Sequence, residues 1–162
     1  MKLQASPDPS VRPTKAIVRK SLFQRLEPWT GRRVCDLYAG IGALGIEALS
    51  RGARHVTFVE QDRALVAVLK QNLARARAGD NHRVITGSVS AFLAAAVRQF
   101  DVLLADPPYN SVTWAELQPQ AEGVLAPGGV FAMELPRQAE VPAELDVRYF
   151  GKSKVALWTR LP

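Results

Sequence analysis

Three glycines in the segment VCDLYAGIGALG have a spacing that could hold a nucleotide-like ligand. Gly40, Gly42 and Gly45 follow a short apolar run in the order G-x-G-x-x-G. Between a strand and a helix, glycines at this spacing let the backbone approach a ligand closely. Glu60 lies 20 residues after Gly40, where a carboxylate can accept both hydroxyls of a ribose. Together these features predict a cofactor that contains adenosine, with a tight turn and a helix cap as the plain alternative.

Asp36 bears on which adenosine cofactor this is, because the glycines and Glu60 alone fit either a nicotinamide dinucleotide or S-adenosylmethionine. Asp36 lies four residues before Gly40, where its carboxylate would repel a pyrophosphate. S-adenosylmethionine instead brings a positively charged amino group, which Asp36 could bind directly or through water. Asp36 therefore favours S-adenosylmethionine, with a strand-end carboxylate held by nearby backbone amides as the alternative. Ser88 is a candidate contact for the adenine ring, although capping of the next helix explains it equally well.

A second chemical motif follows the apolar run FDVLLA, which ends in Asp106, Pro107, Pro108 and Tyr109. Consecutive prolines restrict φ and have no N–H, so nearby carbonyls are left without a local donor. The Asp106 carboxylate and the Pro107 carbonyl could each accept one hydrogen of an exocyclic amine while Tyr109 stacks on its ring. Two such acceptors would direct the nitrogen lone pair toward a methyl donor. The motif predicts methyl transfer to a nucleobase amine; a turn that ends a buried strand is the alternative.

The charge distribution suggests a polyanionic substrate. Residues 1–33 carry eight basic and two acidic side chains, whereas the remaining 129 residues carry 13 of each. This pattern is typical of a polyanion-binding arm on a neutral domain, although a solvated basic helix would look the same. Lys15 and Arg19 are four residues apart and share one helix face. Trp114 lies five residues after Tyr109 and is a candidate substrate contact.

With these residues in place, the chain resembles a family of S-adenosylmethionine-dependent methyltransferases, the RsmD-like enzymes. These modify the N2 amine of a guanine in bacterial small-subunit ribosomal RNA. The resemblance covers nearly the whole chain from Arg12 onward. It rests on Arg12-Pro13-Thr14, Val18-Arg19, Leu22-Phe23, Asp36, Ala39-Gly40, Gly42-Ala43-Leu44-Gly45, Glu47-Ala48-Leu49-Ser50-Arg51-Gly52, Glu60, Asp106-Pro107-Pro108-Tyr109 and Gly151-Lys152.

The resemblance implies the class I methyltransferase fold, a doubly wound Rossmann-like sheet of seven strands, mostly parallel, with an antiparallel last strand. It implies catalysis on an RNA guanine by Asp106, Pro107 and Tyr109, and a cofactor site that includes Ala39. It also implies that Arg12, Thr14 and Arg19 lie near the catalytic mouth. The expected partner is ribosomal RNA or the small-subunit particle.

The secondary structure that must position these residues alternates between short apolar runs and helical stretches, which is typical of βαβ units around a parallel sheet. Strands are expected at Val34–Leu37, Val56–Glu60, His82–Thr86, Phe100–Ala105, Val130–Leu135, Val147–Phe150 and Val155–Arg160. Helices are expected from Thr14 to about Leu26, at Gly42–Ser50, Asp62–Arg77 and Ser90–Gln99, and between Val112 and Leu125, where Pro119 should kink or delay the helix. The last two strands should form an antiparallel hairpin at the sheet edge.

Length and composition set the remaining expectations. A chain of 162 residues with 48% hydrophobic residues predicts one globular domain, with residues 1–33 as a basic extension and helix and residues 34–162 as the methyltransferase domain. Cys35 is the only cysteine. No stretch is apolar enough to span a bilayer, and no signal-peptide core is visible. We therefore expect a cytoplasmic monomer without metal or membrane contact.

Three alternatives remain open from the residues. The same chemistry could act on adenine N6 in DNA or RNA. A nicotinamide-dependent oxidoreductase could use the glycine loop, although it leaves Asp106 to Tyr109 without a role. A non-enzymatic RNA-binding domain is the third.

Overall fold

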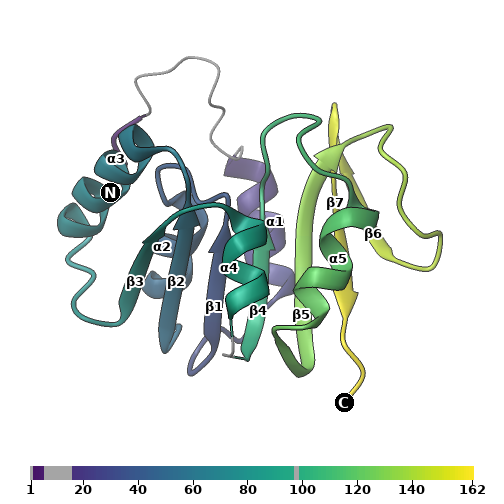
Figure 1. The fold of residues 1–162 in the computed structure, drawn as a ribbon, viewed down its shortest axis with the longest axis horizontal. Coiled ribbons are helices and arrows are strands. Elements are labelled where there is room, and N and C mark those ends of the chain that lie inside the picture. Colours follow the sequence, from purple (N-terminus) through teal and green to yellow (C-terminus); the bar gives the residue numbers. More distant parts are fainter. Residues whose placement is uncertain (1, 6–15, 97–98) are drawn as a thin grey trace.

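The structure is a computed structural model in which residues 2–5, 16–96 and 99–162 are described. A central sheet carries helices on both faces (Figure 1). The helices are α1 (Ala16–Arg25), α2 (Ala43–Ser50), α3 (Arg63–Arg75), α4 (Val89–Ala95) and α5 (Trp114–Glu122). The strands are β1 (Arg33–Leu37), β2 (His55–Glu60), β3 (His82–Thr86), β4 (Phe100–Ala105), β5 (Leu125–Pro136), β6 (Asp146–Phe150) and β7 (Ser153–Thr159).

The sheet has the topology expected from the sequence. Its seven strands follow the order β3-β2-β1-β4-β5-β7-β6. The pairs β1–β2, β1–β4, β2–β3 and β4–β5 are parallel, and β7 is antiparallel to both β5 and β6. Strand β1 is an inner strand, and the strands that follow it in the chain are added outward on both of its sides. This confirms the doubly wound fold and the antiparallel edge hairpin.

Two apolar cores hold the helices to the sheet. Helices α1, α2 and α3 contribute to one core, and α4 and α5 to the other. Neighbouring residues of β1 and β4 alternate between the cores: Val34 and Leu104 join the first, Cys35 and Leu103 the second. Strands buried on both faces are the usual result when helices cover a parallel sheet from both sides.

Most element boundaries agree with the sequence to within one or two residues, but three differ. Helix α4 ends at Ala95 rather than Gln99, because Ala96 adopts an extended conformation and the chain must turn back into β4. Strand β5 begins at Leu125, since pairing with Phe100 continues past a register shift. Helix α5 runs through Pro119, and its start is fixed by Thr113, whose hydroxyl and Glu116 form a capping box.

The first described residues lie against α3 (Figure 1). The backbone N–H of Gln4 donates to Asn72 Oδ1 at 2.8 Å, and Asn72 Nδ2 donates to the Gln4 carbonyl at 3.2 Å. Within the described residues, no helix is long and apolar enough to cross a bilayer.

Candidate active site

The carboxyl ends of the central strands bring the two chemical motifs together. Leu37 at the end of β1 is in register with Val59 of β2 on one side and Ala105 of β4 on the other. The loops that follow these strands therefore emerge at one edge of the sheet, where doubly wound folds bind their ligands. The glycine loop occupies the middle, with Glu60 and Asp106 on its two sides.

The glycine loop is held in place by the neighbouring strand. The Ala39 N–H donates to the Val59 carbonyl at 3.0 Å, and the Gly42 N–H donates to the Ala39 carbonyl at 2.9 Å. Tyr38 and Gly40 both have positive φ, 58° and 57°, so the chain turns sharply as it leaves β1. A non-glycine residue in this conformation is uncommon, and it marks Tyr38 as part of the loop's constrained geometry.

Gly40 differs from the other two glycines of the motif. A Cβ atom built on Gly42 would overlap Leu69, and one on Gly45 would overlap the Phe58 ring, whereas nothing lies within 4 Å of a Cβ built on Gly40. Gly42 and Gly45 thus allow α2 to pack closely, and Gly40 leaves open space at the sheet edge. That open space is what close approach of a ligand to the backbone requires.

Glu60 is anchored rather than free to rotate. Its Oε1 accepts a hydrogen bond from the Gly40 N–H at 2.9 Å, and its Oε2 accepts one from the Asp62 N–H at 2.8 Å. A carboxylate has about four acceptor positions, so each oxygen keeps one for a ribose hydroxyl. Asp62 caps α3 through its own side chain, so Glu60, which is 8% exposed at the end of β2, does not serve as the cap.

Asp36 is buried, with 1% of its surface exposed. Its Oδ2 accepts a hydrogen bond from the Gly45 N–H in the first turn of α2, at 2.9 Å. Burial raises the pKa of the Asp36 carboxyl well above its usual range, although the bond from Gly45 opposes this. The negative charges of Asp106 and Glu60 raise this pKa further, so the three carboxylates form one electrostatic group.

The Asp106-Pro107-Pro108-Tyr109 segment forms a corner after β4. Asp106 and Pro107 are half-buried. The Pro108 carbonyl accepts hydrogen bonds from the Ser111 N–H and hydroxyl at 3.1 and 2.7 Å, whereas no donor from the described residues bonds to the Pro107 carbonyl. Within the described part of the chain, the Pro107 oxygen therefore keeps its acceptor positions open. Tyr109 is 71% exposed, which leaves its ring open for stacking.

Gln138 is a neighbour of this corner that the sequence did not indicate. It lies after β5, and its Nε2 donates to the Tyr109 hydroxyl at 3.2 Å. The bond joins two loops that are 29 residues apart and limits the rotation of the Tyr109 side chain. No local pattern could have revealed this contact, because it depends on β4 and β5 being neighbours in the sheet.

A cavity of about 380 Å³ lies beside the corner on the α4–α5 side. Tyr38, Ser111 and Glu116 are among its lining residues. Burial raises the pKa of the Tyr38 hydroxyl, and the negative charge of Glu116 adds to the effect. Tyr38 was not among the expected site residues; its position directly after β1 was the available signal.

Two expected contacts have structural roles. Ser88 accepts a hydrogen bond from the Ala91 N–H at 3.2 Å and caps α4, which was the alternative for this residue. Trp114 is only 4% exposed and stacks on Phe131, with ring centroids 5.0 Å apart. Trp114 was expected to contact substrate, and in this structure its ring packs in the second core.

Only part of the basic segment, residues 1–33, belongs to the described residues. Arg12, Thr14 and Lys15 lie outside the described residues. Arg19 is half-buried on α1, next to Val18. Val18 and Asp106 both line a small cavity between α1 and the sheet, so α1 does lie beside the corner. Among the described residues, no three His, Cys, Asp or Glu side chains form a metal-binding group.

Comparison with protein families places the chain clearly. A family model described as Conserved hypothetical protein 95 matches residues 1–158. The Escherichia coli (strain K12) protein named Ribosomal RNA small subunit methyltransferase D is 42% identical over 110 residues, which are 67% of this chain and 55% of that protein. The chain thus spans about half the length of that curated relative. YlbH of Bacillus subtilis (strain 168), named provisionally as an rRNA methyltransferase, is 34% identical over 146 residues, covering 86% of this chain and 79% of its own.

Solved structures agree with this result. The Escherichia coli protein yhhF, described provisionally as a methyltransferase, superposes with a TM-score of 0.82 at 34% identity, covering 96% of this chain and 90% of its own. A hypothetical protein from Thermus thermophilus also gives a TM-score of 0.82, at 32% identity over 97% of this chain and 91% of its own. The class I methyltransferase fold expected from the sequence is confirmed.

Proposed function

Because the chain belongs to the RsmD family, whose family model is described as Conserved hypothetical protein 95, we propose that it methylates the exocyclic N2 amine of a guanine in small-subunit ribosomal RNA, with S-adenosylmethionine as the methyl donor. The observation that carries this proposal is the corner of Asp106, Pro107 and Tyr109 beside an acidic, glycine-lined site. The names of the relatives support RNA as the substrate, and the corner supports transfer of a methyl group to an amine.

The residues present fit S-adenosylmethionine. Gly40 leaves open space where the backbone would approach the ligand, and Glu60 retains acceptor positions for the ribose hydroxyls. Asp36, with Asp106 and Glu60 nearby, would favour the cationic amino group, and Ala39 and Gly42 complete the loop. A pyrophosphate would meet the same carboxylates at a cost. When bound, the cofactor supplies an activated methyl group on a cationic sulfur.

The corner would orient the target amine. The Asp106 carboxylate and the open Pro107 carbonyl would each accept one of its hydrogens, while the exposed Tyr109 ring stacks on the base. This turns the nitrogen lone pair away from the aromatic ring, because its hydrogens are drawn toward the two oxygens. As positive charge develops on the nitrogen, Asp106 is placed to accept a proton. Positioning of this kind contributes much of the rate in such displacements.

The target base must leave its stack to reach Tyr109, so an exposed loop nucleotide or a flipped base is the expected substrate. The Gln138 bond to the Tyr109 hydroxyl would hold the ring ready for such a base. Arg19, and Arg12, Thr14 and Lys15 before it in the sequence, would contact the phosphates around it.

The first prediction tests the corner directly. Asp106→Ala should lower the rate of methyl transfer by about 100-fold or more, in line with the loss of one preorganised polar group. Its affinity for S-adenosylhomocysteine should stay within a few-fold of the unchanged protein. The measurement is incorporation of labelled methyl groups into ribosomal RNA and small-subunit particles, with product nucleosides identified by mass spectrometry.

Asp101→Ala is the matched control, because Asp101 lies near the start of the same strand and bonds to Arg33 at the opposite sheet edge. It should leave the rate unchanged. Methyladenosine as the product would instead support an adenine-N6 enzyme, an activity in the name of a Shewanella putrefaciens relative 25% identical to this chain. Tight NADH binding without S-adenosylhomocysteine binding would reject methyl transfer altogether.

A further inference from the structure

A second concentration of positive charge lies in α3 and β3, outside residues 1–33. Residues 63–83 contain five basic side chains and one acidic one, whereas the rest of residues 34–162 contain eight basic and twelve acidic. The balanced total for residues 34–162 therefore hides a local excess of four positive charges. The five basic residues are Arg63, Lys70, Arg75, Arg77 and Arg83.

These five side chains are exposed and lack acidic partners within the described residues. The ion pairs found there involve Arg25, Arg33 and Arg51 instead. Three guanidinium groups elsewhere in the molecule are thus paired with carboxylates, while those on α3 and β3 are not. Unpaired cations on one surface attract a polyanion more strongly than the same charges in ion pairs.

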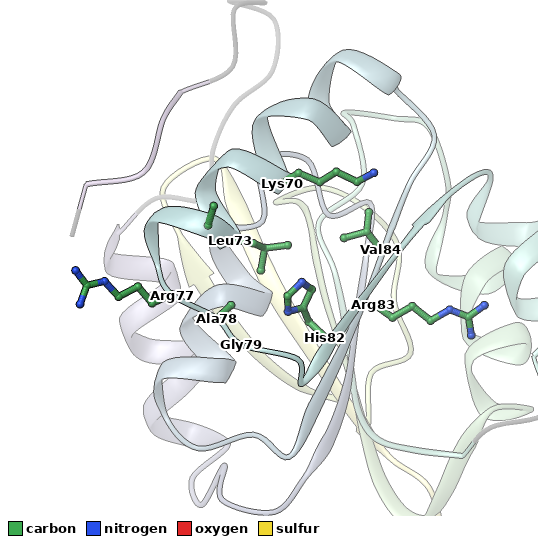
Figure 2. A pocket seen from close by; sticks show the side chains of 9 residues that line it. Lys70, Leu73, Arg77, Ala78, Gly79, His82, Arg83 and Val84 are labelled. Carbon is green, nitrogen blue, oxygen red and sulfur yellow. The ribbon is translucent and has the colours of Figure 1, made fainter.

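A groove runs between the second half of α3 and β3 (Figure 2). It encloses about 540 Å³. Leu73 and Val84 are among its apolar lining residues, and Lys70 and Arg77 supply its charges on the α3 side. Arg83 lines it from the free edge, on the strand face that it shares with Ile85. In Figure 2, Lys70 and Arg83 extend to one side of the view and Arg77 to the other. The charges are therefore spread along the groove rather than converging on one point.

The wall of the groove formed by β3 is a free sheet edge. Strand β3 is the outermost strand, next to β2 alone. The Val56 N–H donates to the Asn81 carbonyl, and the Gly87 N–H donates to the Glu60 carbonyl. In a parallel ladder only every second residue of a strand bonds to a given neighbouring strand, so the odd-numbered residues of β3 bond to β2. The backbone groups of His82 and Val84 therefore face the groove. His82 Nδ1 is buried and has no hydrogen-bond partner among the described residues.

The groove lies on the same sheet face as the N-terminal segment. Helices α1 and α3 share the first core, and Leu3 packs against it. Gln4 is bonded to Asn72 in the second half of α3, so Lys2 lies near this helix at the start of the chain. Lys2 and the groove therefore lie on one side of the molecule.

We propose that this groove binds the sugar-phosphate backbone of the RNA that flanks the target nucleotide. The inference rests on the proposed function for the identity of the polyanion. Strand β3 is three strands from β4, which corresponds to about 14 Å across the sheet at the usual strand spacing, and the groove lies beside the first residues of β3, away from the carboxyl ends of the strands. The groove would therefore hold phosphates several nucleotides from the base at Tyr109. Spread charges, exposed amides and an apolar floor suit a nucleic-acid strand better than one phosphate ion, for which cations should converge.

The test compares two variants that lose the same number of charges. Lys70→Ala/Arg83→Ala removes two cations from the groove, and Arg54→Ala/Arg148→Ala removes two exposed cations, one just before β2 and one on β6. Affinity for a small-subunit ribosomal RNA transcript is measured at several salt concentrations. The groove variant should bind about tenfold more weakly at low salt, and its log affinity should depend on log salt with a slope smaller by about one to two.

The control variant should keep most of the affinity and a slope close to that of the unchanged protein. Both variants should bind S-adenosylhomocysteine normally, which shows that they fold. An unchanged slope in the groove variant, or equal losses in both variants, would overturn the inference. So would displacement of the RNA by millimolar inorganic phosphate that depends on Lys70 and Arg83, because a single-ion site would then explain the groove.

Failure of the proposed function would look different. If no guanine is methylated but the groove variant still loses RNA affinity and slope, the RNA-binding groove stands without the proposed chemistry. If methylation occurs and the groove variant binds RNA like the unchanged protein, the chemistry stands and the groove inference falls.

Discussion

The three glycines of the loop have different roles although they share one sequence motif. Gly42 and Gly45 are required by packing, because a side chain there would overlap Leu69 or Phe58. Gly40 has positive φ and faces open space. Spacing alone groups the three residues; only the structure separates a glycine that permits helix packing from one that permits close approach of a ligand.

This difference predicts opposite defects for two alanine substitutions. Gly42→Ala should destabilise the fold by about 2 to 4 kcal/mol, since it combines an unfavourable backbone conformation with overpacking. Gly40→Ala carries the backbone cost of about 1 to 2 kcal/mol but no overlap, and it should instead lose cofactor affinity by about tenfold. Urea denaturation and titration with S-adenosylhomocysteine measure the two effects. Equal destabilisation by both variants would contradict these separate roles.

Among single residues, the sequence identified the chemistry at the ends of β1, β2 and β4 more readily than contacts between loops. Asp36 and Glu60 could be found because each lies at the end of an apolar strand at a characteristic spacing. Trp114 was assigned to the substrate because it is near Tyr109 in sequence, yet it packs in the core. Gln138 was missed because its contact with Tyr109 spans 29 residues.

At the scale of elements, Asn72 connects three parts of the molecule. It is fully buried on α3. Its side chain bonds to both backbone groups of Gln4 and donates to the Ile41 carbonyl at 2.9 Å. Helix α3 is therefore tied to the N-terminal segment and to the glycine loop at the same point. A structural change in the N-terminal segment should therefore alter the glycine loop, and a change in the loop should alter the N-terminal segment.

Asn72→Ala should release this connection. The backbone groups of half-buried Gln4 and buried Ile41 would lose their partners, which costs about 1 to 3 kcal/mol for each buried group left unsatisfied. We expect lower thermal stability, faster proteolytic removal of the first residues and weaker S-adenosylhomocysteine binding. Limited proteolysis and calorimetry provide the readouts. Gln71→Ala, an exposed neighbour on the same helix, is the control; similar behaviour of the two variants would refute the link.

The elements themselves were largely predictable, because apolar periodicity and caps are local properties. Asp62, the first residue of the expected helix, caps α3, and its side chain accepts from the Ala64 and Leu65 amides. Pro119 does not delay α5, because the Thr113 capping box, itself a local feature, sets its start. Tertiary pairing overrides local preference at β5, which is extended by its pairing with β4.

For the whole molecule, the two free edges of the sheet bear on its association state. Strands β3 and β6 end the sheet. Arg83 lies on β3, and Asp146 and Arg148 lie on β6; all three are exposed. Charged side chains on edge strands oppose pairing with the edge of another copy. We therefore expect a monomer, as the sequence analysis also predicted.

Sedimentation equilibrium across about 1 to 100 μM protein checks this expectation, a range in which an interface worth more than about 8 kcal/mol would be populated. A single mass of 17.7 kDa should be found throughout. A mass that rises with concentration would show that one of the edges, or the basic face, is an interface between copies.

The fold class, the proposed cofactor loop and the proposed amine-binding corner could each be predicted from sequence alone, because each depends on residues close together in the chain. These predictions depend on local patterns: the spacing of the glycines, a carboxylate after one strand and a proline pair after another. Each pattern restricts the backbone or places a charge at a known point of the chain. The tertiary structure decided which glycine faces open space, that Trp114 is buried, that Gln138 reaches Tyr109, and that cations on α3 and β3 flank one groove. Those facts depend on which strands are neighbours, and neighbourhood in a sheet results from packing the whole chain.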